Sequence, residues 1–84
     1  MQSLNGKVFA ITGASRGIGA ATALALAREG CRLGLGGRDE AALEEVARGV
    51  ADAGGEAVAV RCDVRRYEDC ERLASETVGR FGGL

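Results

Sequence analysis

Residues 7–19, KVFAITGASRGIG, join a short apolar run to three glycines. The run over 7–12 is almost wholly apolar and carries β-branched residues, which predicts a strand buried on both faces of a parallel sheet. The alanine- and leucine-rich residues 17–29 predict a helix, and Gly30 suits the turn that ends it. The glycines therefore lie in a turn between a strand and a helix.

The same strand–helix pattern recurs twice along the chain. Residues 31–37 predict a second strand, in which three glycines indicate close approach of a ligand or another backbone segment. Residues 56–62 predict a third strand. Helices are predicted over 39–53, with Asp39 as N-cap, and over 67–81. Their apolar stripes are Leu43, Val46, Ala47 and Val50 in the first, and Cys70, Leu73, Ala74, Thr77, Val78 and Phe81 in the second.

Composition and charge exclude several classes of protein. A net charge of -1 gives no sign of a nucleic-acid or anionic-membrane partner. No stretch is long and apolar enough to span a bilayer, and the first residues lack the pattern of a secretory signal, so we expect a cytoplasmic location. The chain has three cysteines without C-x-x-C spacing and no histidine. No metal site is predicted, and the cysteines are interpreted as structural or incidental.

The glycine-rich turn has the setting of an anion site. A helix N-terminus presents free N–H groups and a partial positive charge, and glycines let the backbone approach a pyrophosphate. The spacing Gly13-x-x-x-Gly17-x-Gly19 is neither the G-x-G-x-x-G dinucleotide fingerprint nor a Walker loop. The turn predicts a phosphate cradle, and the alternative is a glycine-rich turn without a ligand.

The stretch TGASRGIG, following a buried strand, resembles the cofactor signature T-G-x-x-x-G-x-G of the short-chain dehydrogenase/reductase family. VRCDV at 60–64 resembles the Asp-Val after the family's third strand, and FGGL at 81–84 is similar to the segment leading into its fourth. The resemblance covers the whole chain. It implies an α/β fold in which residues 1–84 are the N-terminal βαβαβα half of a Rossmann-type, doubly wound parallel sheet, with three α/β/α layers when complete.

The resemblance assigns roles to individual residues. Asp63 is expected to accept a hydrogen bond from the adenine amino group, with Val64 beside the ring. The alternative for Asp63 is a solvated, helix-capping acid. The loop residues implied for the cofactor are Gly13, Gly17 and Gly19 as the turn, Ser15 and Arg16 near the adenosine ribose, and the backbone of Ile18 at the pyrophosphate.

Charge at the end of the second strand predicts which nicotinamide cofactor binds. An acid about 20 residues past the glycines holds the ribose hydroxyls of NAD and would repel a 2′-phosphate. Here the segment is Gly36-Gly37-Arg38, and its guanidinium suits bidentate phosphate binding. Arg16 offers a second cation. We expect NADP(H) to be favoured over NAD(H), unless both arginines are ordinary surface charges or Asp39 reaches the ribose.

The residues for the family's reaction are missing. The resemblance implies hydride transfer between a small-molecule carbonyl and an alcohol, with Ser, Tyr and Lys as catalytic groups and the last two spaced Y-x-x-x-K. Tyr67 is followed four residues on by Glu71, and the single lysine is Lys7. No catalytic residue is therefore assigned, and the catalytic and substrate half of the domain is expected in an intact homo-oligomeric parent.

The sheet is expected to be incomplete for a physical reason as well. In the strand order 3-2-1-4-5-6 the strand over 7–12 is central, yet here it becomes an exposed edge, and the third helix covers one sheet face alone. Three interpretations stay open: the N-terminal part of an NADPH-dependent oxidoreductase, a stand-alone dinucleotide-binding module without catalysis, or an α/β fragment that binds nothing.

Overall fold

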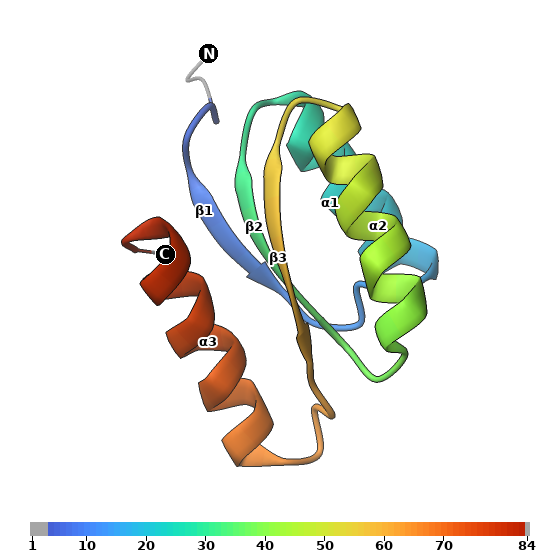
Figure 1. Ribbon diagram of the computed structural model, residues 1–84, viewed down its shortest axis with the longest axis vertical. Helices are drawn as coiled ribbons and strands as arrows, with labels where there is room; N and C mark the ends of the chain where they lie inside the picture. Colours follow the sequence, from blue (N-terminus) through green and yellow to red (C-terminus); the bar gives the residue numbers. More distant parts are fainter. Residues whose placement is uncertain (1–3, 84) are drawn as a thin grey trace.

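The computed structural model describes residues 4–83, in which three strands alternate with three helices (Figure 1). Each predicted element is confirmed to within one residue at its ends. Residues 1–3, and Leu84 of the FGGL segment, lie outside the described residues. The elements are β1 (Val8–Ile11), α1 (Gly17–Arg28), β2 (Arg32–Gly37), α2 (Glu40–Asp52), β3 (Glu56–Arg61) and α3 (Tyr67–Phe81).

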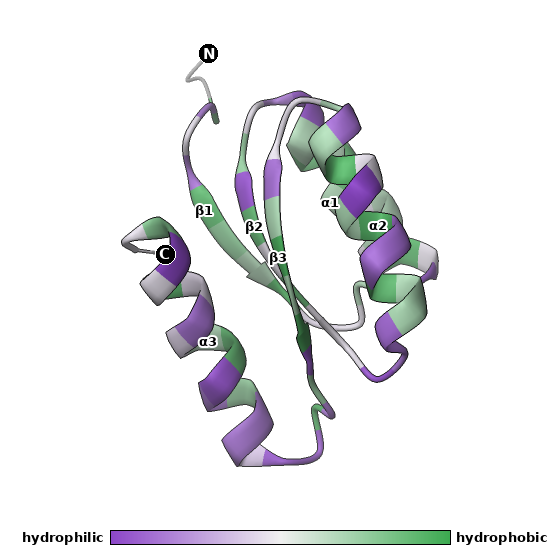
Figure 2. Ribbon diagram, in the orientation of Figure 1, coloured by the Kyte–Doolittle hydropathy of each residue, from purple (hydrophilic) through white to green (hydrophobic). Residues whose placement is uncertain are grey.

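The strands form one parallel sheet in the order β1-β2-β3. Val8 of β1 pairs with Arg32 of β2, which pairs in turn with Glu56 of β3. This arrangement is the βαβαβα half of a doubly wound α/β fold, as expected. Within residues 4–83, β1 has a strand on one side only, although all its residues are hydrophobic (Figure 2). The predicted edge position of this apolar strand is therefore confirmed.

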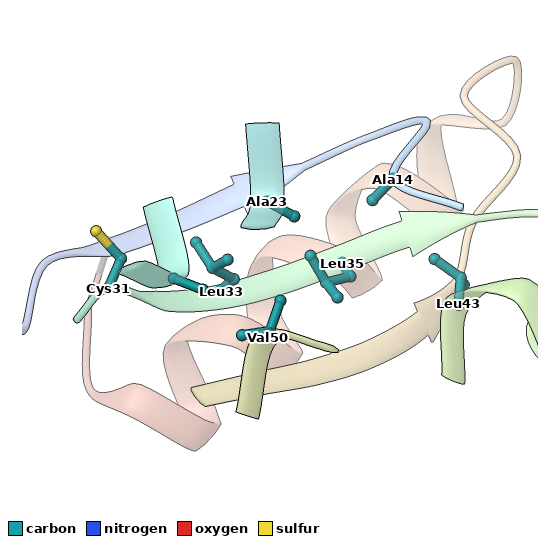
Figure 3. Close-up of a cluster of buried hydrophobic side chains, with 8 residues drawn as sticks. Ala14, Ala23, Cys31, Leu33, Leu35, Leu43 and Val50 are labelled. Carbon is teal, nitrogen blue, oxygen red and sulfur yellow. The ribbon is translucent and has the colours of Figure 1, made fainter. Parts of the chain in front are cut away.

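The helices α1 and α2 cover one face of the sheet and α3 covers the other (Figure 1). Beneath α1 and α2, the buried side chains of Leu33 and Leu35 from β2 lie among Ala23 of α1 and Val50 of α2 (Figure 3). Both leucines point to this face because alternate residues of a strand share a face. The main core of the described chain thus lies between β2 and the first two helices.

The opposite face of β2 is lined by glycine, and α3 packs directly on it. A Cβ at Gly34 would overlap the hydroxyl of Thr77, and a Cβ at Gly36 would lie 2.7 Å from Cδ2 of Leu73. The buried Thr77 hydroxyl donates to the Leu73 carbonyl at 2.6 Å. The close approach predicted at these glycines is real, but the neighbour is a pair of α3 side chains, not a ligand or a backbone segment.

The apolar stripe predicted on α3 is wrong at one residue. Val78 is 42% exposed, whereas Asp69 is only 7% exposed. The face of α3 that meets the sheet is centred on Asp69, Leu73 and Thr77, which are spaced four residues apart and therefore stack on one side of the helix. Val78 lies one residue, about 100°, around from Thr77. No helix within residues 4–83 has the length and apolar character to cross a membrane.

Candidate functional site

The predicted site residues gather at one edge of the sheet. Because the strands are parallel, their carboxyl ends meet there, and ligands of open α/β sheets bind at that edge. Two turns at this edge carry most of the predicted residues. We call residues 12–17, between β1 and α1, the glycine turn, and residues 62–66, between β3 and α3, the Asp63 turn. Arg38 lies between them, directly after β2.

The backbone of the glycine turn requires glycine at two positions. Gly13 and Gly17 have φ values of 62° and 60°, in the left-handed region that other residues rarely adopt. Apart from residues adjacent along the chain or the helix, no described atom lies within 4 Å of a Cβ built on either residue, so conformation and not crowding imposes the choice. The turn is fixed to the sheet because the Ala14 N–H donates to the Gly36 carbonyl at 2.9 Å.

The third glycine acts differently. A Cβ at Gly19 would collide with the carbonyl oxygen of Gly13, so its absence lets α1 approach the turn closely. Arg16 is the N-cap residue of α1, and among the described residues no side chain caps this helix. The first N–H groups of α1, next to the exposed Ile18, therefore remain available to an anion from solvent.

A side chain at position 37, at the end of β2, would crowd its neighbours. A Cβ at Gly37 would lie 3.2 Å from Oγ of Ser15 and 3.3 Å from Cδ2 of Leu43. The next residue, Arg38, is exposed, and its charge is one of the influences that lower the pKa of Asp63, after the stronger hydrogen bonds from Arg65. Ser15, Arg38 and Asp63 thus border the same region of the sheet edge.

Asp39 is the acid that could have competed for a ribose. Its Oδ1 accepts a hydrogen bond from the Ala42 N–H at 3.1 Å, which confirms it as the N-cap of α2. Its Oδ2 lies 3.7 Å from Nη2 of Arg16. Both carboxylate oxygens therefore have partners in the protein, and the pair brings Arg16 toward the end of β2.

In the Asp63 turn, charged side chains hold the backbone. Oδ1 of Asp63 accepts from the backbone N–H and Nε of Arg65, both at 3.0 Å, and Oδ2 accepts from Nη2 at 2.8 Å. These bonds, the side-chain ones first, hold the pKa of Asp63 far below its ordinary value. The N-cap of α3 is Arg66, so Asp63 does not cap this helix. Val64 beside it is 60% exposed.

Sequence reasoning missed the residue that anchors the Asp63 turn. Oδ2 of the buried Asp69 accepts the Asp63 N–H at 2.9 Å. Nη1 of Arg72 lies 3.3 Å from the other Asp69 oxygen, and Nη2 of Arg72 donates to the Arg61 carbonyl at 2.6 Å. The hydrogen bond from Asp63 is the main influence that lowers the pKa of Asp69. An acid in the first turn of a helix is the sequence signal that could have identified it.

Other parts of the described chain offer fewer groups that could bind a ligand or a metal ion. A hollow of about 450 Å³ lies beside the amino end of β1, away from the glycine turn, and its lining includes Lys7, Phe9 and Phe81. No group of His, Cys, Asp or Glu in residues 4–83 could hold a metal ion. The residues predicted from the sequence therefore remain the best candidates for a site.

Comparison with known proteins places this geometry in a family. Residues 7–84 match the family model for short chain dehydrogenases. The chain is 44% identical over 84 residues to 11-beta-hydroxysteroid dehydrogenase A of Sesamum indicum, across 99% of this chain and 24% of that protein. It thus spans about a quarter of the length of this curated relative.

Two similar solved structures hold nicotinamide nucleotides. An NADH-dependent reductase complexed with NAD has a TM-score of 0.86 and 40% identity, over 96% of this chain and 34% of that one. An alcohol dehydrogenase from the archaeon Thermococcus sibiricus, complexed with 5-hydroxy-NADP, has a TM-score of 0.84 and 44% identity, over 90% of this chain and 33% of that one.

Proposed function

Because the chain belongs to the short-chain dehydrogenase family, we propose that it is the cofactor-binding N-terminal part of one Rossmann domain in a longer, NADP(H)-dependent oxidoreductase. The substrate is a small molecule whose carbonyl and alcohol forms are interconverted by hydride transfer, and the substrate and catalytic groups belong to the other part of the domain. The same proposal includes a cytoplasmic location and a homo-oligomeric assembly.

The observation that carries the proposal is the backbone of the glycine turn. Left-handed φ values at Gly13 and Gly17, the close approach at Gly19 and the free N-terminus of α1 together fit a pyrophosphate. The nicotinamide cofactor, when bound, supplies the hydride. The residues of this chain bind and orient its adenosine end.

The preference for NADP(H) rests on two cations. Position 37 is a glycine in a crowded place, so it carries no acid that could hold an unphosphorylated ribose, and Arg38 follows directly. Arg16 lies nearby, within 3.7 Å of Asp39 at the start of α2. The two solved structures described above hold different cofactors, NAD in one and 5-hydroxy-NADP in the other, so this preference depends on the arginines.

Asp63 and Val64 are proposed to hold the adenine. Arg65 occupies three acceptor positions of the Asp63 carboxylate. A carboxylate offers about four such positions, which leaves one for the adenine amino group. The exposed Val64 lies beside it and offers an apolar surface to the ring.

Cofactor titration of the full-length protein tests the preference. Replacing Arg38 with Ala should cost about 1.5–3 kcal/mol of NADPH binding, the range for hydrogen bonds to charged groups. NADH binding should hardly change. The matched control is Arg28→Ala, an exposed arginine at the far end of α1, which should bind both cofactors like the wild type. Equal affinity of the wild type for NADPH and NADH would refute the preference.

A separate assay tests the reaction class. The full-length protein should oxidise NADPH in the presence of some members of a panel of ketones and aldehydes. Tight NADPH binding without turnover of any of them, or of alcohols with NADP⁺, would instead favour a binding module without catalysis.

A further inference from the structure

Two of the three cysteines meet at the Asp63 turn. Cys62 directly follows β3 and is 2% exposed, and Cys70, in the first turn of α3, packs against the cluster of Val60, Cys62 and Leu73. The third, Cys31, belongs to the separate core beneath α1 and α2. We propose that Cys62 and Cys70 are a peroxide-responsive thiol pair that closes to an intramolecular disulfide across the Asp63 turn.

The backbone already brings this pair together. The Asp63 N–H donates to the carboxylate of Asp69 at 2.9 Å, and these residues are the inner neighbours of Cys62 and Cys70. The two segments that a disulfide would join are therefore held side by side in the reduced protein. A disulfide between Cys62 and Cys70 would join segments that already contact one another, so closing it does not require the turn to refold.

The two thiols differ in access to solvent, which assigns their order of reaction. Cys70 is half-buried, and its Sγ lies 3.8 Å from the carbonyl oxygen of the exposed Val64. Burial, and next the neighbouring Cys70 thiol, raise the pKa of Cys62. Because a thiolate is the reactive form, the more accessible Cys70 reacts with peroxide first and Cys62 resolves the product.

The chemistry balances with hydrogen peroxide as the oxidant. The Cys70 thiolate attacks one peroxide oxygen, an S–O bond forms, the O–O bond breaks, and the departing hydroxide takes up the thiol proton as water. The Cys62 sulfur then attacks the sulfenic sulfur of Cys70, forming S–S and breaking S–O. The leaving oxygen departs as a second water with the Cys62 proton. Two thiols are oxidised and one peroxide is reduced.

The test is thiol counting on the full-length protein before and after hydrogen peroxide. The number of titratable thiols per denatured chain should fall by two, with a mass loss of two hydrogen atoms that dithiothreitol reverses. Trypsin cuts after Arg65 and Arg66, between the two cysteines, so the oxidised wild type should yield two peptides joined through Cys62 and Cys70. This mapping needs no variant.

Variants sharpen the assignment. Cys31→Ser should form the same linkage. With peroxide, oxidation of the Cys62→Ser variant should stop at a dimedone-reactive sulfenic acid on Cys70. In the Cys70→Ser variant, the Cys62 thiol should remain reduced. Linked peptides that contain Cys31, dimers joined between chains, or no loss of titratable thiols after peroxide would each overturn the proposal. The proposal does not depend on the cofactor, so its failure can be distinguished from failure of the proposed function.

Discussion

The glycine turn and the Asp63 turn leave the same edge of the sheet, yet different forces fix them. In the glycine turn the backbone itself carries the geometry, through left-handed φ values at Gly13 and Gly17. In the Asp63 turn, side-chain hydrogen bonds fix the geometry, because the Asp69 carboxylate accepts from the Asp63 N–H and Arg65 donates to the Asp63 carboxylate. The first turn should therefore be sensitive to added side chains, and the second to lost charges.

The largest expected effect is that of Gly17→Val. A β-branched residue at φ 60° carries a strain of about 1–3 kcal/mol, and its side chain would fill the space left open for phosphate. Binding of NADP(H) should be lost while most of the helical content remains. Cofactor titration with circular dichroism on the full-length protein checks both expectations.

A second glycine provides the control for this variant. Gly79 lies inside α3, where a built Cβ has no described atom within 4 Å apart from its neighbours along the helix, and its φ is not positive. Gly79→Ala should keep cofactor binding and gain about 0.5–1 kcal/mol of stability, since alanine is the better helix residue. Tight cofactor binding by Gly17→Val would show that the glycine turn is not a phosphate cradle.

A smaller effect is expected in the Asp63 turn from Asp69→Ala. This substitution leaves the part-buried Asp63 N–H without its acceptor and Arg72 without its nearest carboxylate. The urea midpoint of unfolding should fall, and less so for Asp69→Asn, which keeps an acceptor oxygen. The matched control is Glu68→Ala, the exposed acid beside it in the same helical turn, which should unfold close to the wild type. Equal losses for Asp69→Ala and Glu68→Ala would contradict the anchoring role of Asp69.

The smallest expected effect is a difference in acid sensitivity between these variants. Hydrogen bonds hold the pKa values of Asp63 and Asp69 below the ordinary 3.8 in the folded protein. The unfolded chain therefore takes up protons first as the pH falls. The stability that these two groups contribute is present above the ordinary pKa and is lost as the pH falls below it, through the folded values.

Urea midpoints measured from neutral pH down into the acid range check this dependence. The wild type should lose stability more steeply below about pH 4 than Asp69→Asn, which lacks one of the two titrating acids. Parallel curves for the two proteins would show that Asp69 does not contribute to the acid sensitivity.

Much of the molecule follows from local sequence patterns. The bounds of the six elements and the cap at Asp39 are set by hydrophobic period and by turn residues, which act over a few neighbouring positions. The glycine turn belongs with them, because a positive φ is a property of a single residue. The parallel pairing is predicted from the alternation of strands and helices, and the edge position of β1 from the strand order of the doubly wound fold that the resemblance implies. The element bounds, the cap at Asp39 and the glycine turn could be predicted without knowledge of how the elements pack.

Contacts between elements were decided by the tertiary structure. The fit of Thr77 against Gly34 sets the rotation of α3 about its axis on the sheet. This rotation places Asp69 against the sheet and leaves Val78 exposed to solvent. The hold of Asp69 on the Asp63 N–H, and the meeting of Cys62 with Cys70, depend on the same placement of α3. The sequence by itself determined where the turns and elements lie. Only packing decided which side chains from different elements meet, because such contacts depend on the position of a whole helix and not on any local spacing.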